Sequence, residues 1–395
     1  MDDTKKMKIL QVHNYYQIPG GEDTVVANEK KLLEKHGHTV IQYSRNNREL
    51  NQFSKLRKLF LPITTIFNPR TYKEVKKIIG EQQIDVVHVH NTLNLISPAV
   101  YYAALACKVP VVQTIHNFRL LCPGATFYRN GHICEDCVQK GLLCAVKHSC
   151  YRESKVQTLV CTVNTWIHRL TGVYGKLNYI CLTDFNKEKL LNLKQIKPKR
   201  VFVKPNFVTV ENESLIPYKQ RANQFIFAGR LDKLKGIDIL LKVWKQMGDN
   251  APKLLVCGTG PMENWCREYV NENELDTVEL KGLISNTEVK KLIANSKALI
   301  LPTQWYEGFP MTIVESYSVG TPVIGSNIGN VGSVVTEGVT GFKFKADSVE
   351  ELMWGIYQID CNPHICETTF KKYEENYTQT QNYKCLMNIY REISE

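Results

Sequence analysis

Short apolar runs alternate with amphipathic runs along the front half of the chain. The runs at 8–14, 38–44, 84–91 and 109–117 have the length of strands, and the run at 24–37 has helical periodicity. Nearly continuous apolar strands are typical of a parallel sheet that is buried on both faces. Strands that alternate with helices predict βαβ units.

The back half repeats this pattern. The predicted strands are 224–230, 253–261, 297–303 and 321–326, and the predicted helix is 235–247. The chain therefore has two predicted Rossmann-like halves. Open sheets of this kind bind ligands at the carboxyl ends of their strands, so two facing halves would form a cleft.

We expect the domain boundary close to the segment 193–206. The predicted domains are 1–190 and 191–370. Residues 371–395 form a long helical stretch that is expected to return to the first domain.

The composition is that of a soluble globular protein, with 43% hydrophobic and 23% charged residues. No apolar run reaches the roughly 18 residues of a membrane-spanning helix. The opening residues lack an apolar run followed by a cleavage site, so they do not indicate an export signal. We expect a cytoplasmic protein.

The charge is concentrated in the front half. Residues 1–185 contain 24 Lys and Arg against 14 Asp and Glu, and so carry +10 of the total of +11. A basic face predicts an anionic partner, namely a membrane surface, a phosphorylated substrate or a nucleic acid. A solvated basic face without a partner is the alternative.

Gly20 and Gly21 follow the first strand and open the first helix. Glycine there lets a phosphate approach the N–H groups of a helix N-terminus, although the same residues also form ordinary turns. The spacing differs from the dinucleotide fingerprint, and the second strand ends without the acidic residue that would hold a ribose. A nicotinamide enzyme is therefore not expected.

Arg230 and Lys235 lie in "GRLDKLKG" (229–236), between a strand and a helix. Two cations in such a loop can neutralise a diphosphate. Two solvated loop cations are the alternative.

Glu307 and Glu315 flank the start of a helix that Pro310 is expected to open and Gly320 to end. Their separation suits two hydroxyl-bearing parts of one extended ligand better than a single atom. A nucleotide sugar has this shape, and its ribose diol would be a suitable partner for a buried carboxylate. For Glu315, an internal salt bridge or backbone bond is the alternative.

The motifs "GRLDKLKG", "EGFPMTIVE" and "GTPVI" occur in the back half in this order. In this respect the chain resembles the retaining glycosyltransferases of family four. The resemblance covers nearly the whole chain and implies the α/β GT-B fold, in which two Rossmann-like domains face each other across a cleft. It also implies an acceptor-binding first domain, a second domain that binds the nucleotide sugar, and a C-terminal helix that returns to the first domain.

The resemblance assigns roles to individual positions. The implied catalytic residues are His116, Glu307, Arg230 and Lys235, with the two cations on the diphosphate. The implied donor-binding residues are Gly20, Gly21, Gly258, Gly260, Gly282, Leu283, Ile284, Gly308, Phe309, Pro310 and Glu315.

The resemblance also implies the mechanism. Charge stabilisation would supply most of the catalysis, and the sugar would be transferred with retention through attack on the face that the leaving phosphate vacates. No metal is expected, because the chain contains no Asp-x-Asp signature. One position departs from the family pattern, since Ser333 stands where many relatives have an acid.

Five cysteines fall between residues 122 and 150. Cys122, Cys134, Cys137 and Cys150 include one Cys-x2-Cys pair and are a candidate structural zinc site. Reduced thiols that pack a loop are the alternative. The possible substitute ligands are Cys144, His132 and His148.

The segment "HNFRLLCPGATFYRNGHICEDC" resembles bacterial members of the family that build capsule, exopolysaccharide and other surface glycans. That resemblance implies transfer of a hexose or 6-deoxyhexose to a glycan linked to undecaprenyl diphosphate, at the inner face of the cell membrane. Residues 54–67 join cations to apolar side chains and would suit peripheral membrane contact. A helix packed on the front sheet is the alternative.

Other classes of protein are less compatible with these motifs. A non-hydrolysing sugar-nucleotide epimerase shares the architecture but lacks this arrangement of the two glutamates. A zinc-dependent nucleic-acid binding module would need aromatic residues interleaved along a basic strand, and none is evident, so we expect no nucleic-acid partner. A catalytically silent sensor of sugar nucleotides is disfavoured, because all four predicted donor-contacting side chains are present.

Overall fold

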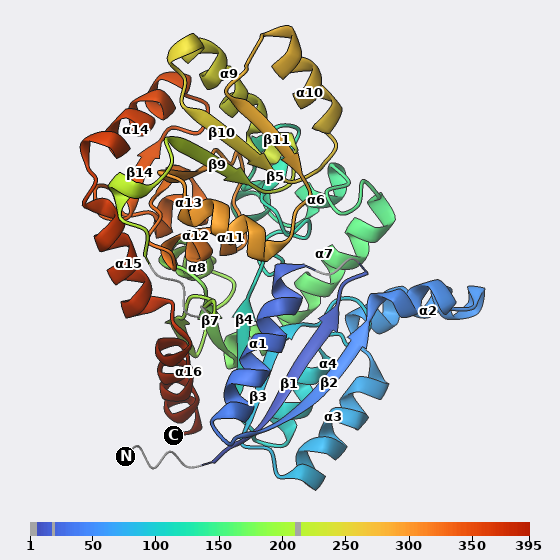
Figure 1. Cartoon of the computed structure of the whole chain (residues 1–395). Coiled ribbons are helices and arrows are strands. Elements are labelled where there is room, and N and C mark those ends of the chain that lie inside the picture. The colour runs from blue at the N-terminus through green and yellow to red at the C-terminus, as the bar shows by residue number, and fades with distance from the viewer. Residues whose placement is uncertain (1–5, 18–19, 210–214) are drawn as a thin grey trace. The chain divides into compact units, whose positions relative to one another are not determined.

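The structure, a computed structural model, describes residues 6–17, 20–209 and 215–395. These divide into two compact units, each of them an α/β assembly (Figure 1). Residues 1–5, which belong to the stretch searched for an export signal, lie outside the described residues. Unit 1 comprises Met1–Arg129, Cys134–Pro205 and Tyr383–Glu395, and unit 2 comprises Asn130–Ile133 and Asn206–Asn382.

Unit 1 is built on a six-stranded parallel sheet in the order β2-β1-β3-β4-β7-β8. Ile9 in β1, the second strand of the sheet, pairs with Val40 of β2 on one side and Val86 of β3 on the other, so the apolar runs lie next to each other. The strands are β1 (Lys8–Tyr15), β2 (Thr39–Asn46), β3 (Val86–Asn91), β4 (Val111–Ile115), β7 (Asn178–Cys181) and β8 (Arg200–Val203), and a separate hairpin is formed by β5 (Tyr128–Arg129) and β6 (His132–Ile133).

The helices of the front half follow the strands, as the periodicity predicts. Several begin at a side chain that caps the free N–H groups of the first turn, as Asn68 and Ser154 do. They are α1 (Gly21–Lys35), α2 (Lys55–Ile66), α3 (Pro69–Gln82), α4 (Ala99–Ala106), α5 (Asp136–Gln139), α6 (Leu143–Lys147), α7 (Lys155–Leu170) and α8 (Asp184–Leu191), with short 3-10 helices η1 (Asn47–Gln52) and η2 (Val173–Lys176).

Unit 2 repeats the architecture with a six-stranded parallel sheet in the order β11-β10-β9-β12-β13-β14. Its strands are β9 (Gln224–Ala228), β10 (Lys253–Cys257), β11 (Val278–Gly282), β12 (Ala298–Leu301), β13 (Val323–Ser326) and β14 (Gly341–Phe344). Its helices are α9 (Ile237–Met247), α10 (Glu263–Glu272), α11 (Asn286–Ala294), α12 (Met311–Tyr317), α13 (Gly329–Val334), α14 (Val349–Cys361) and α15 (Ile365–Asn376), with 3-10 helices η3 (Tyr218–Gln220), η4 (Lys233–Lys235) and η5 (Gly248–Asn250). The predicted pair of parallel α/β units is confirmed.

Both faces of the unit 2 sheet are covered by apolar side chains. Alternate residues of β9 point to opposite faces, so Phe225 and Phe227 pack with Trp244 of α9, while Ile226 packs with Ile313 and Tyr317 of α12. This two-sided burial explains why the strands have no polar alternation in the sequence.

The end of the chain differs from the single helix expected over 371–395. It forms two helices, α15 in unit 2 and α16 (Gln379–Ser394), whose residues from Tyr383 onward belong to unit 1. Leu386 and Tyr390 of α16 are fully buried in the core of unit 1. The predicted boundary after residue 190 also falls too early, because β8 pairs with β7 in the first sheet.

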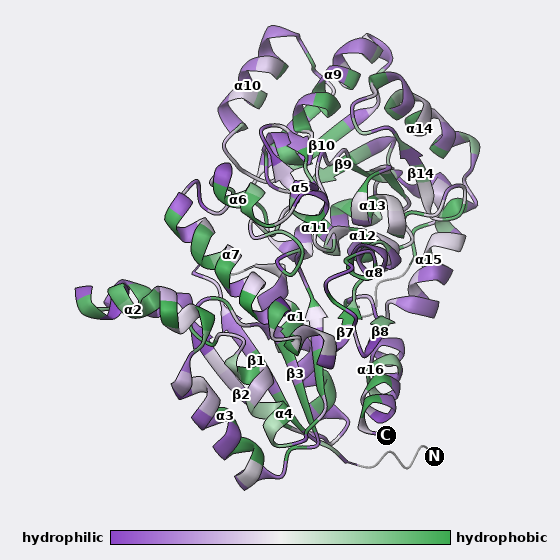
Figure 2. Ribbon diagram, turned by 180° about the vertical axis from the view of Figure 1, so that it is seen from behind, coloured by the Kyte–Doolittle hydropathy of each residue, from purple (hydrophilic) through white to green (hydrophobic). Residues whose placement is uncertain are grey.

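The segment 54–67 forms α2, which leaves its apolar side chains exposed instead of packing them on the sheet. Leu56, Leu59, Phe60 and Ile63 are each at least 51% exposed, although they recur at the spacing of one helix face. Figure 2 shows the apolar residues along α2. Within the described ranges, no helix is both long and apolar enough to cross a membrane.

Candidate functional site

Two neighbouring strands of unit 2 supply the loops of the first candidate site. The chain adds β10 and β11 on one side of β9 and then crosses to β12 on the other side. In parallel sheets, ligands bind at the carboxyl ends of the two neighbouring strands where the order of strand addition reverses, which here are β9 and β12. Arg230 and Lys235 follow β9 and Glu307 follows β12, so the fold brings these predicted residues to the carboxyl ends of two neighbouring strands.

The Glu307 carboxylate is fixed by three hydrogen bonds to one oxygen. Its side chain is buried, and Oε1 accepts from Lys235 Nζ at 2.7 Å, Thr303 Oγ1 at 2.9 Å and Trp305 Nε1 at 3.1 Å. Asn330 of α13 also donates to the Glu307 carbonyl oxygen at 2.6 Å. Because the three side-chain donors all bond Oε1, Oε2 is left for a ligand hydroxyl.

The loop between β9 and α9 orients the two cations. Asp232 accepts from the Lys235 N–H at 3.0 Å and pairs with Arg230 Nε at 3.2 Å. Gly236 ends the loop with φ of +69°, and a Cβ there would lie 1.8 Å from the Pro302 carbonyl oxygen. Glycine is therefore required where the loop after β9 touches the loop after β12.

A cavity of about 330 Å³ lies beside Arg230 and contains Glu315 in its wall. Within the part of the chain that the structure describes, the Glu315 carboxylate has no hydrogen-bond or ion-pair partner. Burial raises its pKa, and Lys290 offsets part of this effect. A partly buried acceptor of this kind is suited to ligand hydroxyl groups.

The cavity gathers only part of the predicted donor-binding set. Its wall contains Gly258, Leu283, Ile284 and Glu315, together with Gly229 and Arg230. The other predicted residues of unit 2 that do not line it are Gly260, Gly282, Glu307, Gly308, Phe309, Pro310 and Lys235.

Gly258 and Gly260 allow two loops to approach each other. A Cβ at Gly258 would lie 1.9 Å from the Gly229 carbonyl oxygen, and one at Gly260 would lie 2.4 Å from the Leu231 carbonyl oxygen. Gly260 therefore has a packing role, and its contact with the donor stays a prediction. Gly258 both packs against the loop after β9 and lines the cavity.

The helix that carries Glu315 is shorter than expected. Pro310 is its N-cap, as the sequence indicates, but α12 has seven residues and ends at Tyr317, before the predicted end at Gly320. Gly308, Phe309 and Pro310 form the segment between Glu307 and this helix, and their contact with a sugar stays a prediction.

In unit 1, the loop with Gly20 and Gly21 opens α1, as predicted. The Gly20 N–H donates to the Asp23 carboxylate at 3.1 Å, so an anionic group of the protein already occupies this helix end. A phosphate contact at the Gly21 backbone remains a prediction.

Glu22 is a buried carboxylate beside this loop that the sequence did not single out. Burial raises its pKa to about 8, although Tyr16 donates a hydrogen bond to Oε2 at 2.8 Å. His13 Nδ1 lies 3.8 Å from Oε1 and, like Oε1, has no hydrogen-bond partner among the described residues. A protonated Glu22 is favoured near neutral pH for these reasons.

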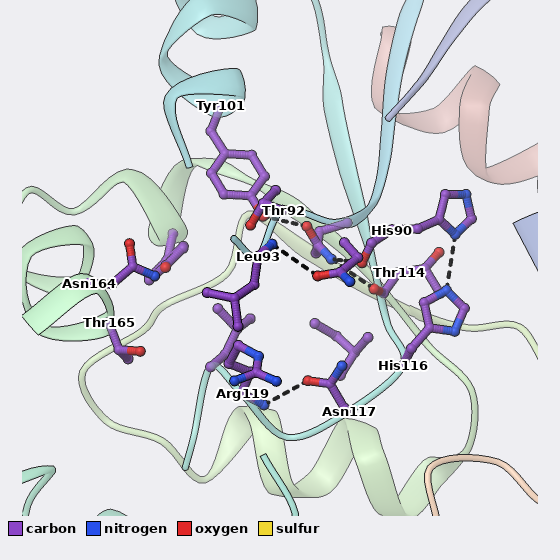
Figure 3. A pocket seen from close by; sticks show the side chains of 15 residues that line it. His90, Thr92, Leu93, Tyr101, Thr114, His116, Asn117, Arg119, Asn164 and Thr165 are labelled. Carbon is purple, nitrogen blue, oxygen red and sulfur yellow. Dashed lines mark hydrogen bonds between the residues drawn. The ribbon is translucent and has the colours of Figure 1, made fainter. Parts of the chain in front are cut away.

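His116 directly follows β4 and lines a small cavity of about 50 Å³ in unit 1. Figure 3 shows His116 beside His90, and His116 Nε2 lies 3.0 Å from His90 Nδ1. Burial holds the pKa of both imidazoles well below the usual value, so both rings are neutral near pH 7.

The predicted zinc site is not supported. Cys122, Cys134, Cys137 and Cys150 surround one small cavity as free thiols, together with Cys144 and His148. In a tetrahedral zinc site with Zn–S of about 2.3 Å, sulfur atoms are about 4 Å apart. Among the described residues, no three of these side chains bring their ligand atoms within 4.8 Å of one another. The alternative of reduced thiols packing a loop agrees with this arrangement.

Glu29, His90 and Lys204 are further buried residues that sequence reasoning missed. They lie far apart in the chain, on α1, on β3 and after β8. The one signal was the pair His88 and His90 inside an otherwise apolar strand, where a buried imidazole needs a partner.

Comparison with known proteins agrees with this architecture. Residues 19–134 match the family model described as Glycosyltransferase Family 4, and residues 212–376 match Glycosyl transferases group 1. An uncharacterized glycosyltransferase of Methanocaldococcus jannaschii, MJ1178, is 26% identical, over 98% of this chain and 99% of its own length. An uncharacterized 41.2 kDa protein in the cps region of Klebsiella pneumoniae is 24% identical, over 87% of this chain and 88% of its own.

Solved structures share the fold at low sequence identity. A glycosyltransferase from Rickettsia africae has a TM-score of 0.69 at 19% identity, with 98% of each chain covered. Anabaena HepE in complex with UDP has a TM-score of 0.63 at 15% identity, with 97% of this chain and 99% of that chain covered. The two family matches lie in different halves and together span most of the sequence. The two halves of the chain therefore match two glycosyltransferase family models, and the chain shares the two-domain fold of these solved glycosyltransferases.

Proposed function

We propose that the protein transfers a hexose or 6-deoxyhexose from a nucleoside-diphosphate sugar, with retention, to a lipid-linked glycan acceptor of a bacterial cell surface. The observation that carries the donor half of this proposal is the Glu315 carboxylate, which has no partner among the described residues and lies in the wall of a cavity next to Arg230. A ribose diol would supply the missing donors, and Arg230 would bind the diphosphate. The UDP held by the structural neighbour HepE supports a nucleoside diphosphate as the ligand.

Lys235 and Glu307 would serve the sugar end of the donor. The Lys235 ammonium uses one of its three N–H groups on Glu307 Oε1, so two are left for the diphosphate. Glu307 Oε2 would accept a hydrogen bond from a sugar hydroxyl. The departing diphosphate would then be stabilised by Arg230 and Lys235 without a metal, and it would help to remove the acceptor proton.

The donor site can be tested without knowledge of the acceptor. We expect one class among UDP-, TDP- and GDP-sugars to raise the melting temperature of the full-length protein, because a ligand that binds only the folded state stabilises it by about 3 kcal/mol at 100 times its dissociation constant. Glu315→Gln should need at least about a tenfold higher concentration of the nucleotide sugar to reach the same rise in melting temperature, since the amide loses one charged hydrogen bond or more.

Glu288→Gln is the matched control, since Glu288 is a carboxylate of the neighbouring α11 that does not line the cavity. An equal shift in Glu315→Gln and in the wild type would contradict the assignment of Glu315 to the ribose. No shift with any nucleotide sugar would contradict the donor site as a whole.

The acceptor half of the proposal rests on an exposed apolar surface of unit 1. Helix α7 lies next to α2, where His168 hydrogen-bonds the Ile66 carbonyl at 2.9 Å. Both helices expose large apolar side chains, and Lys55, Arg57 and Lys58 lie among those of α2. Apolar side chains with nearby cations favour an anionic membrane interface. The exposed apolar residues, here named the α2–α7 surface, are Leu56, Leu59, Phe60, Ile63, Val156, Leu159, Trp166 and Leu170.

We expect the protein to co-sediment with phosphatidylglycerol vesicles and less with phosphatidylcholine vesicles, and to be released by salt. Replacing Leu59 and Phe60 together by serine should weaken binding about tenfold or more, because each large side chain contributes roughly 1.5–3 kcal/mol when it is buried. Tyr357→Ser removes an exposed aromatic residue of unit 2 and is the control. Unchanged binding of the double variant would exclude α2 as the contact.

A further inference from the structure

A chain of buried polar side chains runs through unit 1 to His116. Lys204 is 0% exposed, Glu29 1% and His90 3%, so none of these groups can bond bulk water. Buried polar groups of this kind need partners within the protein, and the contacts among these three residues supply some of them.

The contacts form a line with three links. Lys204 Nζ donates to Glu29 Oε1 at 2.6 Å, Glu29 Oε2 lies 3.5 Å from His90 Nε2, and His90 Nδ1 lies 3.0 Å from His116 Nε2. Among the described residues, neither Glu29 Oε2 nor His90 Nε2 has a hydrogen-bond partner, so their 3.5 Å approach leaves each of them facing the other. The centroids of the His90 and His116 rings are 5.3 Å apart and their planes differ by 26°. Figure 3 marks the hydrogen bond between them with a dashed line.

A metal ion would be one explanation for part of this cluster. Glu29, His88 and His90 bring their ligand atoms within 4.8 Å of one another. However, the Lys204 ammonium already pairs with Glu29 and would repel a cation. Both ring nitrogens of His88 are also occupied, by Tyr390 and Thr114 at 2.7 Å each. The arrangement therefore favours a chain of protons over a metal site.

The position of each proton follows from the buried ion pair. A carboxylate only accepts hydrogen bonds, so the single proton of a neutral His90 must lie on Nε2, facing Glu29. His90 Nδ1 is then a bare acceptor. The proton of His116 must consequently lie on its Nε2, facing His90.

We propose that Glu29, acting through His90, holds His116 in the Nε2–H tautomer, so that His116 Nδ1 is presented to the substrate as a hydrogen-bond acceptor. Glu29 and His90 are positioning residues in this scheme, since neither is assigned a contact with substrate. The role of Nδ1 toward a sugar or acceptor hydroxyl rests on the proposed function, whereas the tautomer itself does not.

The surroundings of the two rings agree with neutral imidazoles. Burial lowers the pKa of His90 and of His116, and the charged or titratable groups that face them lower it further. Among the four buried side chains Lys204, Glu29, His90 and His116, the acidic group is Glu29, and it is already paired with Lys204. The other groups that face the two rings are His13 and His88.

The tautomer can be read directly from the full-length protein labelled with ¹⁵N-histidine. Long-range ¹H–¹⁵N spectra separate a protonated from a bare ring nitrogen, and His116→Gln assigns the signal. We expect a protonated Nε2 and a bare Nδ1 on His116 without any substrate. A protonated Nδ1, or an imidazolium near pH 7, would overturn the proposal.

Glu29→Gln tests the origin of this preference. The amide carbonyl can still accept from Lys204, while its NH₂ group donates to His90 Nε2, so both rings should change tautomer and His116 should carry its proton on Nδ1. We expect kcat to fall at least about tenfold, the cost of a reversed hydrogen bond, with a smaller change in the donor KM. Glu34→Gln, an exposed carboxylate on the same helix, should change neither the spectrum nor kcat.

The outcomes separate the two parts of the argument. An unchanged His116 tautomer in Glu29→Gln would contradict the proposal that Glu29 sets this tautomer through His90. A transition metal that binds the wild type and is lost in this variant would contradict it as well. A reversed tautomer with unchanged transfer overturns the contact of His116 with substrate and leaves the chain intact. If Glu29→Gln does not fold, His90→Phe serves instead, because removal of the His90 acceptor should leave His116 with a mixture of tautomers.

Discussion

Replacing Glu307 by glutamine is expected to reduce sugar transfer about 100-fold and to leave the fold intact. Oε1 of this carboxylate accepts from Lys235, Thr303 and Trp305. An amide in its place loses the charge that holds Lys235. With its carbonyl oxygen in the place of Oε1, its NH₂ group would stand where Oε2 is proposed to accept from the sugar hydroxyl. A hydrogen bond that involves a charged group contributes about 1.5–3 kcal/mol, which corresponds to roughly 10- to 150-fold in rate.

The rate is measured as release of nucleoside diphosphate from the donor that the thermal screen identifies. Glu279→Gln is the matched control, because Glu279 is a carboxylate of the same unit that pairs with Lys253 and Lys281 but lies outside the loops after β9 and β12. Lys235→Met should lose activity to a similar extent, since it removes the other partner of the pair. Wild-type rates in Glu307→Gln would refute the assignment of this residue to the donor sugar.

Replacing Gly258 by alanine is expected to destabilise unit 2 by about 3 kcal/mol or more and to abolish donor binding. The new Cβ would lie 1.9 Å from the Gly229 carbonyl oxygen, and the backbone φ of +136° is one that side-chain-bearing residues rarely adopt. The loops after β9 and β10 would have to separate, and both contribute to the wall of the donor cavity.

The measurement is chemical denaturation of the full-length protein together with the nucleotide-sugar thermal shift. Gly338→Ala is the control, because Gly338 also has a positive φ, of +68°, but its new Cβ would meet no atom within 4 Å. That variant should lose only about 1 kcal/mol, the cost of the left-handed conformation. An equal decrease in the free energy of unfolding of the two variants would contradict this prediction, because it would mean that the loops move apart at no cost when the Cβ at Gly258 meets the Gly229 carbonyl oxygen.

The parts of the molecule that could be predicted from the sequence are those with a local signal. The apolar runs of β1 and β9 identify buried parallel strands, because each strand is covered on both faces. Pro310 marks the start of α12 because proline suits the first turn of a helix. Arg230, Lys235 and Glu307 were found because strand-to-helix loops of parallel sheets meet at one edge.

The remaining features depend on contacts between distant segments. Gly236 is required by the Pro302 carbonyl, 66 positions later, and no local pattern reports that approach. Lys204 and Glu29 are 175 positions apart, so a lone lysine and a lone glutamate gave no indication of a buried pair. The zinc alternative for the cysteines failed, and the reduced-thiol alternative agrees with the structure, because Cys-x2-Cys spacing records distance along the chain and not where the other cysteines lie in space.

The return of α16 to unit 1 makes the order of synthesis important. Leu386, Met387 and Tyr390 complete a core whose other residues include Ile9 and Val86, near the opposite end of the sequence. Unit 1 therefore cannot bury its full apolar surface while the chain is still on the ribosome and α16 is unmade. Unit 2 is a nearly continuous segment that is made before most of α16, so its core can form without this helix, whereas the core of unit 1 cannot be completed without it.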